Sequence, residues 1–98
     1  MEKNTPHCKL EIIKSLLRQG RVRKTATALL GAAALGIDEM EMVAIVAALG
    51  SRDFFKSMTT HDDHRIWQDV YRPLTPHGAL YVKLTVIDDV LIVSFKER

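Results

Sequence analysis

The chain has 98 residues, of which 47% are hydrophobic and 27% are charged, and its formal net charge is +2. This length suits one compact domain, residues 1–98, and is too short for two. The sequence contains no run of 18 apolar residues and no apolar stretch behind its N-terminus, so we expect a cytoplasmic protein without a membrane span or a signal peptide.

Positive charge is concentrated at the start of the sequence. Residues 1–24 carry seven basic side chains and only two acidic ones, whereas residues 51–98 carry seven of each sign. A basic first quarter suits a polyanionic partner such as RNA, and it suits an ordinary solvated helix nearly as well. The single cysteine, Cys8, leaves no disulfide framework and no Cys-based metal site, and we expect a partly buried, inert thiol.

Helix-end signals and apolar spacing predict a helical first half. Thr5 is a suitable N-cap, Pro6 a suitable first helical residue, and Gly20 a stop signal. Capping by Thr25 and by Asp38 predicts two further helices, which end before glycines. The expected helices are residues 5–19, 25–35 and 38–49, followed by one helical turn at 51–55.

The second half of the sequence predicts strands. Residues 57–64 are polar and are expected to form a loop, and residues 65–72 are expected to form a strand that ends at Pro73. Residues 80–87 and 90–96 predict a hairpin around Asp88 and Asp89. Helices followed by neighbouring strands favour the α+β class.

The hairpin register separates apolar from polar side chains. With Asp88 and Asp89 as the turn, the pairs are Ile87 with Val90, Thr85 with Ile92, Lys83 with Ser94, and Tyr81 with Lys96. The opposite face is then entirely apolar and is expected in the core: Val82, Leu84, Val86, Leu91, Val93 and Phe95. Directly opposed side chains have Cβ atoms about 5 Å apart, so a phenol and an ammonium lie side by side on an accessible surface. Solubility of an exposed strand would explain that pair equally well.

Three blocks of sequence resemble the MqsR toxins. They are "DFFKSMTTHDDHRIWQDVYRP", "YVKLTVIDDVLIVSFKER" and the start, "MEKNTPH". The resemblance runs along the whole chain and is densest at residues 53–73 and 81–98. It implies a RelE-like ribonuclease fold, a small, mainly antiparallel sheet packed by N-terminal helices. It also implies the toxin of a type II toxin–antitoxin system, an endoribonuclease that cuts mRNA at GC-containing sites such as GCU without the ribosome.

The resemblance also carries over individual residues. The family's catalytic set matches four positions: Lys56, Gln68, Tyr81 and Lys96. Weaker expectations of RNA contact fall on four others: His7, Phe55, Lys83 and Arg72. Phe55 stands where the family often has Tyr, so any hydrogen bond made by that hydroxyl is missing here. No cofactor is expected.

Metal-free RNA cleavage places clear demands on these side chains. The ribose 2′-hydroxyl attacks the adjacent phosphate and expels the 5′-oxygen, which leaves a 2′,3′-cyclic phosphate. Fixed cations stabilise the charge on the phosphorane, and Lys56 and Lys96 are the candidates. Tyr81 is a candidate to donate or relay a proton, and Gln68 to orient the phosphate or the ribose. The general base stays open.

Other side chains have competing interpretations. His7, expected in the first helical turn, suits a supporting role or mere capping. The string "HDDH" at residues 61–64 contains metal-ligand types but favours a polar loop over a metal site. Trp67 favours the core over a base-stacking platform.

Partners and rival functions complete the expectations. The resemblance implies a cognate antitoxin like MqsA, whose zinc belongs to that partner, and an indirect effect on operator DNA through it. Three helices and a hairpin also describe a winged-helix DNA-binding regulator. However, the third helix, "DEMEMVAIVAALG", has no Arg or Lys and would read a groove poorly. A basic protein-interaction module is the remaining alternative.

Overall fold

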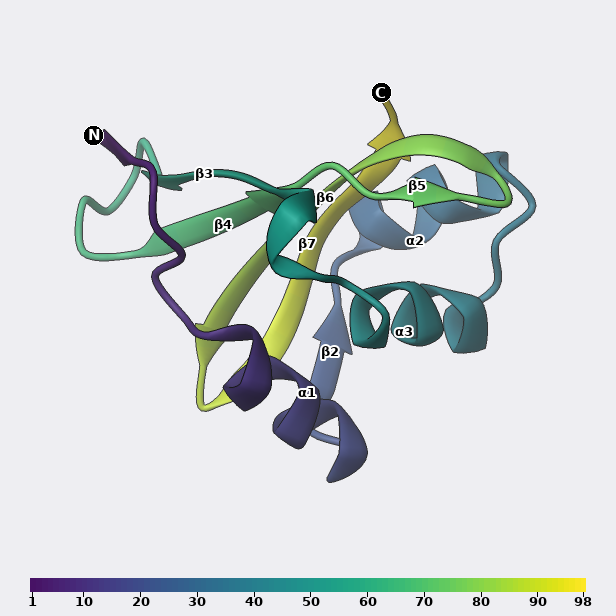
Figure 1. Cartoon of the computed structure of the whole chain (residues 1–98), viewed down its shortest axis with the longest axis horizontal. Helices are drawn as coiled ribbons and strands as arrows, with labels where there is room; N and C mark the ends of the chain where they lie inside the picture. Colours follow the sequence, from purple (N-terminus) through teal and green to yellow (C-terminus); the bar gives the residue numbers. More distant parts are fainter.

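Three helices pack on one face of a mainly antiparallel sheet (Figure 1). The computed structural model describes all 98 residues. The helices are α1 (Leu10–Arg18), α2 (Ala26–Ala34) and α3 (Glu39–Ala47), followed by the 3-10 turn η1 (Ser51–Asp53). The strands are β1 (Glu2–Lys3), β2 (Val22–Lys24), β3 (Phe54–Thr59), β4 (Trp67–Tyr71), β5 (Leu74–Thr75), β6 (Gly78–Ile87) and β7 (Asp89–Glu97). The predicted α+β class is confirmed. None of the helices has the length and apolar character that crossing a membrane requires.

The long hairpin of β6 and β7 lies in the middle of the sheet. The strand order is β1-β3-β4-β6-β7-β2, and β5 pairs with β6 beside this path. All neighbours are antiparallel except β2, which runs parallel to β7. The wing of a winged helix is a hairpin outside any large sheet, whereas β6 and β7 are interior strands of a seven-stranded sheet, so this arrangement argues against the DNA-binding alternative.

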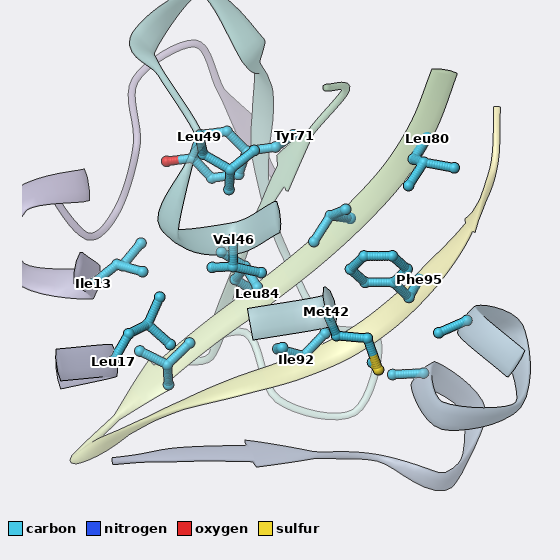
Figure 2. Close-up of a cluster of buried hydrophobic side chains, with 14 of the residues drawn as sticks. Ile13, Leu17, Met42, Val46, Leu49, Tyr71, Leu80, Leu84, Ile92 and Phe95 are labelled. Atoms are coloured by element: carbon cyan, nitrogen blue, oxygen red, sulfur yellow. The ribbon is translucent and has the colours of Figure 1, made fainter. Parts of the chain in front are cut away.

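The core fills the space between the helices and one face of the sheet (Figure 2). Helical side chains such as Ile13, Met42 and Val46 meet strand side chains such as Leu84 and Phe95, all of them at most 1% exposed. Burial of this apolar surface is the main stabilising term, at about 25 cal/mol per Å². The opposite face of the sheet is free of helices and is called the outer face below.

The caps of α2 and α3 are as the sequence predicts. The Thr25 hydroxyl accepts a hydrogen bond from the Ala28 amide at 3.0 Å, and an Asp38 carboxylate oxygen accepts one from the Glu41 amide at 2.8 Å. Gly36 follows α2 with φ +74°, a conformation that glycine adopts without strain. These caps satisfy amide groups that have no partner inside the helix.

The start of the first helix was predicted wrongly. α1 begins at Leu10, and residues 2–3 form an edge strand that pairs with β3. The amides of His7 and Cys8 donate to the two carboxylate oxygens of Asp69, at 2.9 and 3.0 Å. Two hydrogen bonds to one buried carboxylate hold this segment extended, although Thr5-Pro6 is a good local helix start.

The structure of the segment after η1 was also predicted wrongly. Residues 54–59 form β3 rather than a helical turn and a loop, and β3 pairs with β1 on one side and β4 on the other. Pairing on both sides satisfies the backbone of this polar stretch, a tertiary effect that local pattern does not reveal. Residues 60–66 remain a loop, as expected of the His/Asp string.

The hairpin has the predicted register at one end only. Its turn is a single residue, Asp88 with φ 64°, and Val93 is an extra residue in β7, so the pairing shifts by one between Lys83 and Leu84. As a result Val90 and Ile92 lie in the core, whereas Leu91 and Val93, predicted there, are only partly buried.

α2 explains where this bulge falls. The Thr25 hydroxyl donates to the Val93 carbonyl at 2.7 Å, and the Thr25 amide donates to the Ile92 carbonyl at 3.1 Å. A Cβ atom at Gly31 would overlap the Phe95 carbonyl oxygen, so only glycine lets α2 approach β7 this closely. Because of the bulge, Phe95 and Lys96 keep the strand partners and the sheet faces that were predicted for them.

Candidate active site

All four candidate catalytic residues project from the outer face. Residues paired across neighbouring strands share a face, and alternate residues of a strand lie on opposite faces. Tyr71, Val82 and Phe95 form one row on the core face. The next row, displaced by one residue, is on the outer face: Lys56, Val70, Lys83 and Ser94. By the same alternation Gln68 of β4, Tyr81 of β6 and Lys96 of β7 lie on the outer face too.

The row that contains Lys56 is the centre of this face. Val70 in this row is 2% exposed yet takes no part in the helix-side core, so its neighbours on the outer face cover it. Gln68 is two residues from Val70 along β4, and so lies at one side of this row. Tyr81, paired with Lys96, is two residues from Lys83 along β6 and lies at the other side of the row. A step of two residues is about 6.6 Å, so the four side chains span a face wide enough for a short stretch of RNA.

An aromatic and cationic cluster occupies the Tyr81 end. A bulge between Phe54 and Lys56 makes Phe55 the extra residue of β3, and its ring centroid lies 6.3 Å from that of Tyr81. The Arg72 guanidinium carbon is 4.0 Å from the Phe55 ring centroid, and Lys56 Nζ is 5.3 Å from it. Both distances fit cation–π contact. The structure therefore brings Phe55 and Arg72 to the candidate catalytic residues.

The electrostatic character of the outer face is mainly positive. Lys83, Lys96 and Arg72 have no ion-pair partner. Lys56 has one, because its Nζ lies 2.9 Å from a carboxylate oxygen of Glu2. Several cations fixed on one sheet face are what a phosphodiester with developing negative charge requires.

Glu2 is a site residue that sequence reasoning missed. It reaches Lys56 because β1 pairs with β3. Glu2 is opposite Met58, which is two residues from Lys56 along β3 and therefore on the same face. A strand of two residues has no detectable periodicity, so no local signal could have revealed it. Only the pairing of β1 places this carboxylate on the outer face.

His7 does not lie on the outer face. Its ring stacks on Trp67 with centroids 5.5 Å apart, and its Nδ1 lies 3.1 Å from Lys3 Nζ. Trp67 alternates with Gln68 along β4 and therefore lies on the side of the sheet opposite the outer face. The prediction that Trp67 belongs to the core is wrong. Its side chain is only half-buried, and Lys3 Nζ lies 4.1 Å from its ring centroid.

A buried polar cluster lies beneath the N-terminal segment. Asp69 is 3% exposed and binds the His7 and Cys8 amides. Burial, together with the negative charge of Asp69, raises the pKa of the Cys8 thiol, which agrees with the expected inert thiol. The Tyr71 hydroxyl is buried without a hydrogen-bond partner, and burial raises its pKa well above the ordinary value.

The His/Asp-rich loop is not arranged as a metal centre. No group of three or more His, Cys, Asp or Glu side chains is placed to hold a metal ion. Asp63 instead accepts hydrogen bonds from the Arg65 side chain at 3.0 and 3.1 Å, and these bonds lower the pKa of its carboxyl group. His61 and His64 are exposed.

The basic first quarter is partly neutralised within the protein. Arg21 Nε lies 2.9 Å and Arg23 Nε 3.9 Å from the carboxylate of Asp89, and Lys24 Nζ lies 3.3 Å from that of Glu39. These pairs join β2, and Arg21 just before it, to β7 and α3. The cations available to an anion are therefore those of the outer face more than those of residues 21–24.

Comparisons with known proteins identify the family of the chain. The family model described as "Motility quorum-sensing regulator, toxin of MqsA" matches residues 5–97. The mRNA interferase toxin MqsR of Escherichia coli (strain K12) is 55% identical over 98 residues, which cover 100% of both chains. A RelE-like fold is consistent with this family. The chain belongs to the MqsR toxin family.

Proposed function

We propose that the protein is an mRNA endoribonuclease, the toxin of a type II toxin–antitoxin system, and that the outer face of its sheet is the cleavage site. The observation that carries this proposal is the placement of Lys56, Gln68, Tyr81 and Lys96 on one face, with cationic side chains between them. The relationship to an mRNA interferase toxin supports it. Cleavage of mRNA represses translation and growth.

The reaction is an attack by the ribose 2′-hydroxyl on the adjacent phosphate. The 2′-hydroxyl gives up its proton to solvent water as the O2′–P bond forms and the P–O5′ bond breaks, and the products are a 2′,3′-cyclic phosphate and a 5′-hydroxyl. Lys56 and Lys96 stabilise the charge on the non-bridging oxygens. Tyr81, beside Lys96, supplies a proton to the leaving 5′-oxygen, and Gln68 orients the ribose or the phosphate.

The reaction needs neither the ribosome nor a metal ion. The nucleophile belongs to the substrate, and the ammonium groups of the outer face provide the positive charge that a metal would otherwise supply. Full activity in the presence of EDTA is therefore expected.

Substrate choice is proposed to favour GC-containing sites such as GCU. Phe55 stands close to Tyr81 and Arg72, where a base can stack on its ring. Because Phe55 lacks the hydroxyl that the family often has, we expect Phe55→Tyr to keep the overall rate within a few-fold and to sharpen the choice of base at one position. Sequencing the cleavage ends of a randomised RNA measures this, and an identical site distribution for both proteins would contradict it.

A cognate zinc-binding antitoxin of the MqsA type is the proposed protein partner. Zinc belongs to that partner, and the toxin affects operator DNA through it. The open edges of the sheet are β1 and β2, and an added strand from a partner can pair with such an edge. Docking along β1 would also cover Glu2, next to the cleavage site.

The test is a ribosome-free cleavage assay in EDTA. Purified protein is incubated with a defined RNA that contains GCU sites and with a matched RNA that carries 2′-deoxyribose at those sites. Cuts that leave a 2′,3′-cyclic phosphate, and that disappear in the deoxy substrate, are expected. Absence of cleavage by folded protein, or cleavage that requires a metal ion or ribosomes, would contradict the proposal.

A further inference from the structure

A cleft lies beside Arg72, at the border of the outer face. This cleft, about 710 Å³ in volume, is formed between the C-terminal half of α3 and the chain segment 72–77. One wall consists of Ala44, Ile45 and Ala48, and the other includes Pro73 and Leu74. Leu74 is 83% exposed, so an apolar surface faces solvent there. Ligand sites commonly have volumes of about 300–1,000 Å³, so the cleft is large enough for a nucleotide.

Two arginines and two carboxylates line the cleft, and only the carboxylates have hydrogen-bond partners within the protein. Arg52 and Arg72 both line it, and neither has an ion-pair partner. The two acidic residues of the lining are already engaged within the protein. An Asp53 carboxylate oxygen accepts from the Gly50 amide at 2.8 Å, and Glu41 Oε2 lies 2.9 Å from His77 Nε2. Guanidinium groups bind phosphate in a fixed two-pronged geometry, so the free groups of this cleft suit a phosphate.

The cleft shares one side chain with the proposed cleavage site. The Arg72 guanidinium stacks over Phe55, whose ring neighbours Tyr81, and the same Arg72 side chain lines the cleft. A polymer bound beside Phe55 on the outer face therefore has Arg72 as a contact in common with the cleft. An isolated apolar pocket would not have this relationship to the site.

We propose that the cleft is a subsite for a nucleotide of the same RNA that flanks the cleavage site. Its base packs between the apolar wall of α3 and the segment 73–74, and its phosphate binds Arg52 and Arg72. Packing of a base on apolar side chains tolerates any base, because every base has a π-face. The subsite therefore strengthens binding of longer RNAs without adding to the sequence preference. This inference rests on the proposed function.

The test compares RNAs that differ only in the flank of the cleavage site. One RNA carries the target with no flank, and two others carry a short single-stranded flank on the 5′ or the 3′ side. Ala48→Trp fills the cleft, and Ala47→Trp is the matched control, because Ala47 is an exposed neighbour on the same helix outside the cleft. For the wild type we expect one flank to raise kcat/KM about tenfold. Ala48→Trp should lose this gain while cleaving the unflanked RNA at the wild-type rate, and Ala47→Trp should keep it.

A second pair of variants tests the phosphate contact. Arg52→Ala should lose most of the same gain, whereas Arg18→Ala, which removes an equal charge at the exposed end of α1, should not. Binding of the corresponding uncleavable deoxy RNAs, measured by fluorescence anisotropy, provides a readout that does not need catalysis. Failure to cleave any RNA would overturn the proposed function, and the binding data would still test the cleft. A flank effect that is absent, or equal in the Ala48→Trp and Ala47→Trp proteins, would overturn the subsite, and would leave a protein segment as the occupant to examine.

Discussion

The Glu2 carboxylate lies 2.9 Å from Lys56 Nζ at the centre of the outer face. The two side chains are 59% and 29% exposed, so the pair is worth only about 0–1 kcal/mol, and a phosphate can displace the carboxylate. In the free protein Glu2 thus holds the ammonium group over the sheet. In the complex with RNA the Glu2 carboxylate is a negative charge beside a phosphate and repels it.

Glu2→Gln should therefore strengthen RNA binding. We expect an uncleavable deoxy RNA to bind about three- to fivefold tighter at low salt, because no carboxylate competes for Lys56, and we expect the difference to shrink as salt screens the charges. Glu11→Gln on α1 is the control for net charge. Weaker binding by Glu2→Gln than by the control would show that Glu2 positions Lys56 rather than competing with RNA.

Removal of the Asp69 carboxylate should release the N-terminal segment. Asp69→Ala leaves the amides of His7 and Cys8 without their acceptor, and hydrogen bonds to a charged group contribute about 1.5–3 kcal/mol each. We expect the free energy of unfolding to fall by about 2–3 kcal/mol. Hydrogen exchange at the His7 and Cys8 amides should speed up. Asp62→Ala in the exposed loop is the comparison, and unchanged exchange in Asp69→Ala would refute this role.

Tyr71→Phe should stabilise the protein or leave it unchanged. The Tyr71 hydroxyl is buried without a partner, and leaving a buried polar group unsatisfied costs about 1–3 kcal/mol. A rise in Tm is the expected result. A loss of more than about 1 kcal/mol would indicate a hydrogen bond to an internal water instead.

The same residue predicts a pH dependence. Burial raises the pKa of the folded Tyr71 above its ordinary value of 10.0, so the unfolded chain releases this proton first. The stability that depends on protonated Tyr71 is complete below pH 10.0 and is lost as the pH rises above it. Denaturant melts across this range should show a steeper decline for the wild type than for Tyr71→Phe. Parallel declines would contradict the assignment.

The sequence predicted the open end of the hairpin better than it predicted the backbone around it. Tyr81 and Lys96 are opposite one another as expected, because the hairpin keeps the predicted register from Lys83 to its open end. The bulge at Val93 changed which residues of β7 are buried, and it depends on hydrogen bonds from Thr25, 68 residues away in sequence. No local pattern contains that information.

The misplaced elements have the same physical origin. β3 was expected as a turn and a loop because Ser51 can cap a helical turn and residues 57–64 are polar, yet pairing with β1 and β4 fixes it as a strand. Lys56 and Arg72 were therefore assigned to the site by resemblance alone, whereas Glu2 is placed beside Lys56 only by a tertiary contact. The helix caps at Thr25 and Asp38 were predictable because a cap is a local interaction.

The most direct test of the outer face as the cleavage site is single-turnover cleavage by variants of its four residues. Lys56→Ala, Gln68→Ala, Tyr81→Phe and Lys96→Ala are compared with Lys14→Ala on α1, and circular dichroism checks that each protein is folded. Loss of one group that stabilises or protonates the transition state costs about 10²–10³-fold, so we expect rate losses of this order at Lys56, Tyr81 and Lys96, a smaller loss at Gln68, and none at Lys14. Rates within twofold of wild type in the folded Lys56, Tyr81 and Lys96 variants would contradict the account.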